Sequence, residues 1–303
     1  TNKRATVLLI VTLALSLALA LSAISWRRHE PGVRAKLIAP AVEIAGFSRA
    51  EGPREMVFPA DYGPHPDYLT EWWYYTGNLD TADGLHFGYQ LTFFRRGLVP
   101  PTKRQDRPSN WATDQVYMAH FAITDVAGKR YQAFERLSRG AVGLASAQTM
   151  PYQVWLGDWK VEETKPDSFR LHAAQDDLTL DLSLTDRKGP VLQGDRGYSQ
   201  KGPEPGNASY YYSQTRLESS GTVQVADRQY RVSGLSWMDH EFSASSLAGD
   251  QVGWDWFSVQ LDDGSELMVF QIRQQDGSAD PFSSGTLVEP DGSTHRLARA
   301  DFE

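Results

Sequence analysis

The alternation of apolar and polar residues predicts short β-strands over most of the chain. Residues 87–93 carry Phe, Tyr, Leu and Phe at every second position, and residues 178–184 repeat the pattern with four leucines. A period of two is typical of a strand with one buried face. Turn sequences rich in Gly and Asp, such as Asp80–Gly84, separate the strands, and helical periodicity is nearly absent after the first thirty residues. The pattern therefore predicts an all-β fold of antiparallel barrels or sandwiches.

The strands fall into two groups on either side of a Gly- and Pro-rich segment, Gly189–Gly206. We therefore predict a first β-barrel-like domain over residues 58–207 and a second over residues 208–303. Residues 29–57 contain Pro, Arg and Ala without a sustained period, and this composition predicts a linker.

The first 28 residues have the pattern of a signal peptide or a membrane anchor. Lys3 and Arg4 precede an unbroken run of apolar or small residues from Ala5 to Trp26, and Arg27 follows it. As a helix, the run spans a hydrocarbon core of roughly 30 Å. It predicts a cleaved export signal or an uncleaved membrane anchor, with a buried helix of a soluble domain as the alternative. We expect a protein of the bacterial cell envelope, either periplasmic or anchored in the inner membrane.

The composition narrows the classes of molecule that the protein is expected to bind and the chemistry that it can carry out. Lys plus Arg number 30 and Asp plus Glu number 38, a net charge of −8, which lacks the concentrated basic surface that nucleic acid requires. The chain has no cysteine, which excludes disulfides, thiol catalysis and Cys-ligated zinc. Nine Trp and thirteen Tyr are many for this length and suggest an apolar small-molecule ligand.

The stretch 237–242 contains the main candidates for catalytic residues. On a strand, Trp237, Asp239 and Glu241 point to one face, and the three residues between and after them point to the other. Two carboxylates on one face raise the pKa of one of them toward the range of a general acid. Trp254 and Trp256 share a second face, opposite Asp255. The alternative is that Asp239 and His240 only satisfy backbone groups at a strand end.

Other motifs are weaker. In the aromatic run 72–75, Trp73 and Tyr75 share one face; one face of this strand must pack in the core, while the other lines a cavity or meets the second domain. His120 lies on the polar side of its strand, where it is placed to line a cavity. No two histidines are spaced as zinc ligands on one element, so no metal site is predicted. The chain also lacks the G-x-S-x-G turn of a serine hydrolase.

These stretches together resemble the lipocalin-like family that includes carotenoid 1,2-hydratase (hydroxyneurosporene synthase) and the AttH-type proteins. The resemblance is closest to the exported AttH-like branch and runs in order from about Phe58 to the end. The strings that carry it are Asp61-Tyr62-Gly63-Pro64-His65, Glu71-Trp72-Trp73-Tyr74-Tyr75-Thr76-Gly77, residues 87–95, Ala119-His120-Phe121-Ala122, residues 237–242 and Gly253-Trp254-Asp255-Trp256-Phe257.

The resemblance implies two lipocalin-like antiparallel β-barrel domains, with the last strands of the second missing after Glu303. In the hydratase branch, water adds to an isoprenoid double bond without a cofactor. Asp239 matches the family's acidic position, and Trp254 and Trp256 are placed to stabilise a carbocation. The hydratase pattern has a tyrosine just ahead of its acid, whereas this chain has Trp237-Met238 there.

Two functions from different classes follow. The first is binding of an elongated apolar ligand, an isoprenoid or a lipid, in a β-barrel cavity. The second is a cofactor-free hydro-lyase, resembling carotenoid 1,2-hydratase, with Asp239 as general acid. The candidate ligand contacts are Trp73, Tyr75, His120, Trp237, His240, Glu241, Trp254, Asp255 and Trp256. An accessory role in an envelope transport system is a third possibility.

Overall fold

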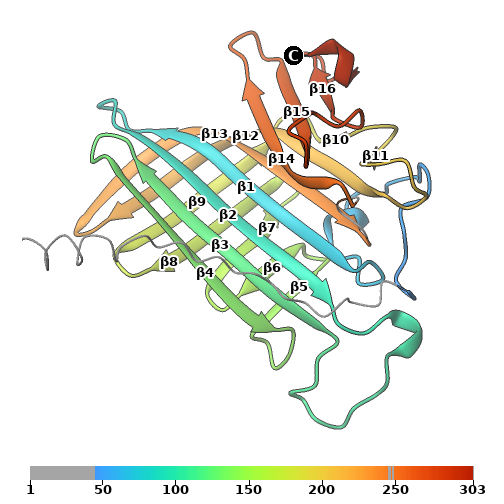
Figure 1. Ribbon diagram of the computed structural model, residues 1–303. Helices are drawn as coiled ribbons and strands as arrows, with labels where there is room; N and C mark the ends of the chain where they lie inside the picture. The colour runs from blue at the N-terminus through green and yellow to red at the C-terminus, as the bar shows by residue number, and fades with distance from the viewer. Residues whose placement is uncertain (1–44, 245–246, 248, 303) are drawn as a thin grey trace, which may run out of the picture. The chain divides into compact units, whose positions relative to one another are not determined.

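The computed structural model describes residues 45–244, 247 and 249–302, and in these the regular structure is almost all β-strand (Figure 1). The exceptions are three short 3-10 turns, η1 (Ala60–Tyr62), η2 (Pro101–Lys103) and η3 (Arg299–Asp301). The predicted all-β class is confirmed. Among the described residues, no helix has the length and apolarity to span a membrane. The predicted signal or anchor, residues 1–28, and most of the predicted linker lie outside the described residues.

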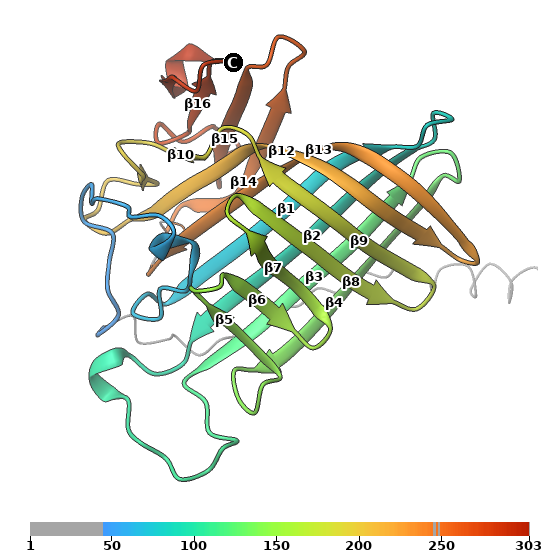
Figure 2. The same cartoon turned by 180° about the vertical axis from the view of Figure 1, so that it is seen from behind.

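One antiparallel sheet contains thirteen strands in the order β4-β3-β2-β1-β13-β12-β9-β8-β7-β6-β5, with β10 and β11 also paired to β12. It curls into a nearly closed barrel, whose two sides appear in Figures 1 and 2. Its strands are β1 (Thr70–Asp80), β2 (His86–Gly97), β3 (Gln115–Asp125), β4 (Arg130–Arg139), β5 (Ala145–Gln148), β6 (Gln153–Leu156), β7 (Trp159–Lys165), β8 (Ser168–Gln175), β9 (Leu178–Asp186), β10 (Pro190–Leu192), β11 (Tyr198–Gln200), β12 (Ala208–Val225) and β13 (Arg228–Ser243).

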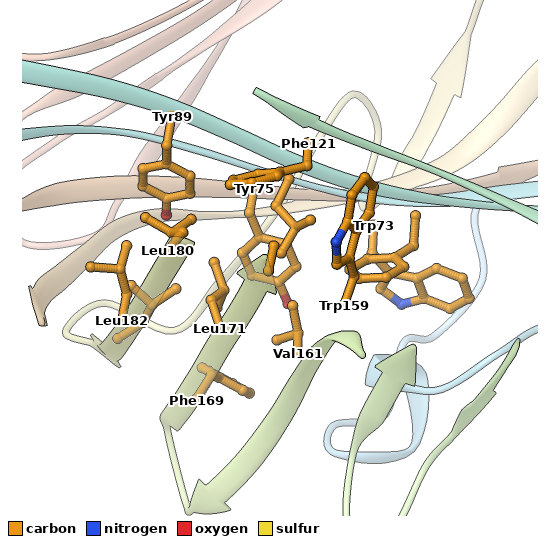
Figure 3. Packing of buried hydrophobic residues seen from close by; sticks show 14 of the residues in the cluster. Trp73, Tyr75, Tyr89, Phe121, Trp159, Val161, Phe169, Leu171, Leu180 and Leu182 are labelled. Atoms are coloured by element: carbon orange, nitrogen blue, oxygen red, sulfur yellow. The ribbon is translucent and has the colours of Figure 1, made fainter. Parts of the chain in front are cut away.

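Side chains fill the interior of this barrel. The alternating leucines of β9 are all buried there, as their spacing predicts. Trp73, Tyr75, Phe121 and Trp159 pack against them without exposed surface (Figure 3). Close packing of large aromatic and branched side chains is what stabilises a barrel of this size. The sequence predicted a ligand cavity inside a barrel. The candidate cleft that is described in the next subsection lies instead outside the barrel wall.

The strands β12 and β13 belong to the barrel, and this bears on the predicted domain boundary. β12 pairs with β9, and β13 pairs with β1 from Thr70 opposite Ser243 to Asp80 opposite Ser233. The boundary predicted between residues 207 and 208 thus falls between strands of one hydrogen-bonded sheet. The Gly- and Pro-rich segment contains β10 and β11, which lie along β12 instead of linking two domains. The described residues do not confirm the two-barrel organisation.

A second sheet follows, with β14 (Gln251–Gln260), β15 (Glu266–Gln274), β16 (Ser284–Val288) and β17 (Thr294–Ala298) in sequence order. Glu266 of β15 is fully buried and joins this sheet to the barrel, because its carboxylate pairs with Lys188 at 2.7 Å and Arg216 at 2.5 Å. Gln260 of β14 donates to the backbone oxygen atoms of Thr215 at 2.7 Å and Ser236 at 3.0 Å. These bonds hold β14 across the outer face of β12 and β13.

Candidate functional site

The stretch 237–242 contributes to two separate systems, one on each face of β13. Trp237 packs with residues of the second sheet outside the barrel, whereas Met238 belongs to the barrel core. His240 stacks on Trp73 inside the barrel, with ring centroids 4.8 Å apart. The predicted alternation is therefore confirmed. Asp239 lies on the outer face, and the histidine next to it lies on the inner face.

Asp239 is held by three donors that all reach the same oxygen. Its Oδ1 accepts hydrogen bonds from the hydroxyl groups of Tyr211 (2.9 Å) and Ser213 (2.5 Å) and from Trp237 Nε1 (2.9 Å). None of the hydrogen bonds formed by the described residues reaches Oδ2. Trp256 Nε1 in turn donates to the Tyr211 hydroxyl at 3.2 Å. The carboxyl group therefore has a fixed orientation, with one oxygen fully engaged.

Burial makes this carboxyl a weak acid. The Asp239 side chain is almost inaccessible to water, and this desolvation raises its pKa to about 7, although the three hydrogen bonds act in the opposite direction. The charge of Glu241 on the same face adds to the increase. Because Oδ1 is occupied by three donors, Oδ2 is the oxygen that carries the proton of the neutral form. With a pKa of about 7, roughly half of the Asp239 carboxyl groups are protonated near pH 7, and this protonated form can donate a proton to a ligand.

Two hollows lie beside Asp239, between the barrel wall and β14. A cavity of about 40 Å³ is lined by Trp72, Lys201, Tyr211, Glu241, Leu247, Trp254, Trp256, Phe270 and Ile272. A more open groove of about 450 Å³ is lined by Tyr74, Thr76, Gly77, Asn78, Trp237 and residues 256–260. Glu241 lines the cavity and Trp237 lines the groove, and these two residues flank Asp239 on the same face of β13. The buried Asp239 itself is not among the residues that line either hollow. We refer to the cavity and the groove together as the cleft.

Trp256 lines both parts of the cleft. Its ring meets Tyr74 and Trp237 edge to face, with centroids 5.4 and 6.2 Å apart. Trp254 lines the cavity with it, which agrees with the predicted common face of the two tryptophans. Asp255 is not among the cleft residues and forms an ion pair with Arg273 at 3.4 Å. The cleft is therefore rich in aromatic rings, and the carboxyl group of Asp239 lies next to two of the residues that line it, Trp237 and Glu241.

The inner face of β13 joins a buried polar network centred on Glu71. Oε1 of Glu71 accepts from His65 Nδ1 and His240 Nε2, both at 2.8 Å, and Oε2 accepts from Arg95 Nε at 2.8 Å. Burial opposes ionisation of Glu71, but Arg95 and the two histidines hold its pKa well below the ordinary value. His240 Nδ1 lies 2.9 Å from the Tyr212 hydroxyl. The network ties the segment before β1 to the four strands β1, β2, β12 and β13 at one end of the barrel.

The two histidines of this network have opposite protonation tendencies. Burial lowers the pKa of His240, so its neutral ring donates from Nε2 to Glu71 and accepts from the Tyr212 hydroxyl at Nδ1. Burial also acts to lower the pKa of His65, but hydrogen bonds to Asp61 and Glu71 outweigh it and raise that pKa. A charged His65 lies between two carboxylates, which is the arrangement that favours the imidazolium form.

Side chains of this network also include a possible set of metal ligands. The ligand atoms of His65, Glu71 and His240 all lie within 4.8 Å of one another. The sequence argument from spacing did not find this set, because its members come from three separate segments. Both histidines already donate to one carboxylate oxygen, and Arg95 pairs with the other. A divalent cation would meet that guanidinium charge, so the arrangement fits a hydrogen-bonded support better than a metal centre.

The remaining predicted ligand contacts lie away from Asp239. Trp73 and Tyr75 are core residues on the opposite face of β1, where Trp73 Nε1 donates to the Tyr62 carbonyl at 3.2 Å. Trp72 and Tyr74 are the residues of that run that line the cleft. His120 shares the outer face with Asp239 but lies three strands away, roughly 14 Å at ordinary strand spacing. It pairs there with Glu135 at 3.1 Å.

Three residues of the site were not predicted, namely Tyr211, Ser213 and Lys201. The run Tyr210–Tyr212 stands out in the sequence, but nothing local indicates which strand it pairs with. The register does, because Tyr211 lies opposite Glu241 and Ser213 opposite Asp239. Side chains directly opposite each other on antiparallel strands share a face.

A nearly closed all-β barrel, with an acid outside its wall in a cleft of aromatic side chains, defines a lipocalin-like protein. The chain belongs to the AttH-like family, which matches residues 49–303. The crystal structure of an AttH from Nitrosomonas europaea is 36% identical in sequence, with a TM-score of 0.74, over 84% of this chain and 76% of that one. The resemblance to the AttH-type proteins is thus confirmed.

A more distant structure shares the fold. Kievitone hydratase from Nectria haematococca is 11% identical, with a TM-score of 0.58, over 83% of this chain and 71% of that one. No curated protein matches the chain. This likeness shows a shared fold, and the matches do not single out carotenoid 1,2-hydratase.

Removing the central charge of the inner network should destabilise the fold. In Glu71→Gln, Arg95 and the charged His65 lose their buried counter-charge, and we expect a loss of about 3–5 kcal/mol in the free energy of unfolding. Urea denaturation at pH 7 measures this. The control is Glu218→Gln, which breaks an exposed pair with Arg187 and should cost less than about 1 kcal/mol. Equal small losses in both variants would contradict the support role.

The raised pKa of Asp239 predicts that the stability of the folded protein falls as the pH rises. Between its ordinary value of 3.8 and about 7, the unfolded chain binds fewer protons than the folded one, so folded stability falls as pH rises. Asp239→Asn cannot ionise and escapes this loss. Relative to the wild type, its free energy of unfolding should improve by up to about 4 kcal/mol between pH 4 and pH 8.

Thermal or urea unfolding across this pH range measures the difference. The control is Asp181→Asn, because Arg170 lowers the pKa of the Asp181 carboxyl and the control should show a small change of opposite sign. A constant difference between Asp239→Asn and the wild type at all pH values would show that the Asp239 pKa is ordinary.

Proposed function

We propose that this protein binds an unsaturated apolar ligand in the cleft and adds water to one of its double bonds without a cofactor. The observation that carries the proposal is the neutral acid at Asp239, oriented by three donors and placed among aromatic rings. The shared fold with a protein named as a hydratase supports the same reaction class.

The chemistry requires Asp239, which lies directly behind the cleft residues Trp237 and Glu241, and the aromatic rings of the cleft. Oδ2–H of Asp239 transfers its proton to one carbon of the double bond, and the π electrons form the new C–H bond. The other carbon becomes a carbocation, which the faces of Trp254 and Trp256 stabilise. Water attacks this carbon, and its extra proton returns to the Asp239 carboxylate. The atoms balance, and the acid is regenerated.

The three donors to Oδ1 have a function in this cycle. Protonation of the ligand leaves Asp239 as a carboxylate, and Tyr211, Ser213 and Trp237 stabilise the charge at that moment without moving. Tyr211 also bears on the one departure from the hydratase pattern. Trp237 and Met238 occupy the positions ahead of the acid, but β12 brings a tyrosine hydroxyl to the same carboxyl from the neighbouring strand.

Binding without chemistry is the second candidate. Four aromatic side chains of the groove favour it, and they lie beside polar residues such as Thr76, Asn78 and Gln260. The groove volume of about 450 Å³ is in the range of small-molecule sites. Export to the cell envelope, attachment through residues 5–26 and service to an envelope transport system are expectations that accompany this function. In that case Asp239 contributes only polarity to the cleft.

Incubation of the protein with acyclic isoprenoid alkenes in H₂¹⁸O tests the reaction. Hydration should give an alcohol that carries one ¹⁸O, detected by mass spectrometry. Asp239→Asn should lower the rate by about 10²- to 10⁴-fold, since it removes the general acid. The wild-type rate should fall as pH rises through about 7, because the neutral acid is lost.

Asp181→Asn is the matched control, since it removes an acid on the barrel surface and should leave the rate unchanged. Binding of the alkenes with no labelled alcohol would favour the carrier. Hydration that persists in Asp239→Asn would assign the acid elsewhere.

A further inference from the structure

Lys201 presents an ammonium group to the cavity without a hydrogen-bond acceptor. Its side chain is 12% exposed and lines the cavity, yet none of the hydrogen bonds formed by the described residues involves Nζ. Nζ forms an ion pair with Glu241 Oε1 at 3.5 Å, which is longer than an ordinary hydrogen bond to nitrogen. The nearest ring centroids are those of Phe270, 3.9 Å away, and Tyr211, 5.3 Å away.

Such a group is costly to bury. An ammonium ion has three donors, and an aromatic face stabilises the charge but accepts no conventional hydrogen bond. In the part of the chain that the structure describes, the ammonium group of Lys201 has one long ion pair, to Glu241, and no short hydrogen bond. A ligand oxygen in the cavity would satisfy them. The volume of about 40 Å³ fits a small oxygen-bearing group and not a chain of several carbons.

The position of Lys201 relative to Asp239 suggests how a ligand with an oxygen atom in the cavity would be oriented. The cavity lies at the Glu241 side of Asp239, and the groove lies at the Trp237 side. Asp239 and Glu241 are two residues apart on one strand face, about 7 Å. A ligand with its oxygen at Lys201 that extends along β13 toward the groove would lie alongside Asp239 a few bonds from the oxygen.

We propose that Lys201 selects ligands that carry a carbonyl or carboxylate oxygen at one end of an unsaturated apolar body. This inference rests on the proposed function, because it assumes that the cleft is the ligand site. It names the ligand class as an oxygenated compound and not a plain hydrocarbon. Lys201 acts on specificity and takes no part in proton transfer.

Three fluorescent polyenes test the proposal, namely cis-parinaric acid, its methyl ester and the hydrocarbon diphenylhexatriene. The acid offers a carboxylate, the ester offers a neutral carbonyl, and the hydrocarbon offers no oxygen. Energy transfer from tryptophan reports binding near Trp254 and Trp256. The wild type should bind at least one of the two oxygenated probes about 10- to 100-fold more tightly than Lys201→Met does, the effect of one charge-assisted hydrogen bond.

Binding of the hydrocarbon should be the same in Lys201→Met and the wild type, which shows that the variant cleft is intact. Lys165→Met is the matched control, since it removes an exposed lysine of β7 and the same unit of charge. Glu241→Gln separates the two oxygen sources, because loss of a nearby negative charge should strengthen binding of the acid and leave the ester unchanged.

Each outcome has one meaning. Equal weakening of all three probes in Lys201→Met, or no weakening of any, overturns the role of Lys201 while the cleft stands as the ligand site. Absence of energy transfer with every probe overturns both this inference and the proposed function.

Discussion

The rest of the structure depends on the interactions of the buried Glu71 carboxylate with its positively charged and hydrogen-bonding partners. It has no exposed surface, and it meets Arg95 of β2, His65 of the segment before β1 and His240 of β13. A buried ion that loses a partner is strongly destabilising, so these segments are specified as a set. The strand that this network fixes from inside is the strand that carries Asp239 outside. The position of the candidate acid is thus set by a charge on the other side of the barrel wall.

β13 separates two kinds of polar chemistry by its pleat alone. The inner network balances charges, because its carboxylates meet arginine and a charged histidine. The outer carboxyl of Asp239 meets only neutral donors, and burial therefore raises its pKa instead of lowering it. Neighbouring residues on one strand can differ this much because each responds to its own face. A strand-end polar knot and a candidate site are both present, one residue apart.

The sequence predicted what depends on local periodicity. The all-β class, the faces of Trp237–Phe242 and the shared face of Trp254 and Trp256 follow from a period of two, and the structure has them. The family resemblance directed attention to Asp239. Its hydrogen-bond partners depend on the register between β12 and β13, and that register is set by pairing along the whole length of both strands. The placement of the Gly- and Pro-rich segment depends on pairing in the same way, because it contains two short strands that lie along β12.

Because of the long strands β12 and β13, the barrel and the second sheet both contribute to the cleft. They close the barrel through β9 and β1, and they also carry Tyr211, Ser213 and Asp239 beneath β14. Neither the barrel alone nor the four-stranded sheet alone contains a complete site. For protein engineering, this means that the cleft cannot be grafted as a separate module. In evolution, the barrel and the sheet that covers its wall would have to be inherited together.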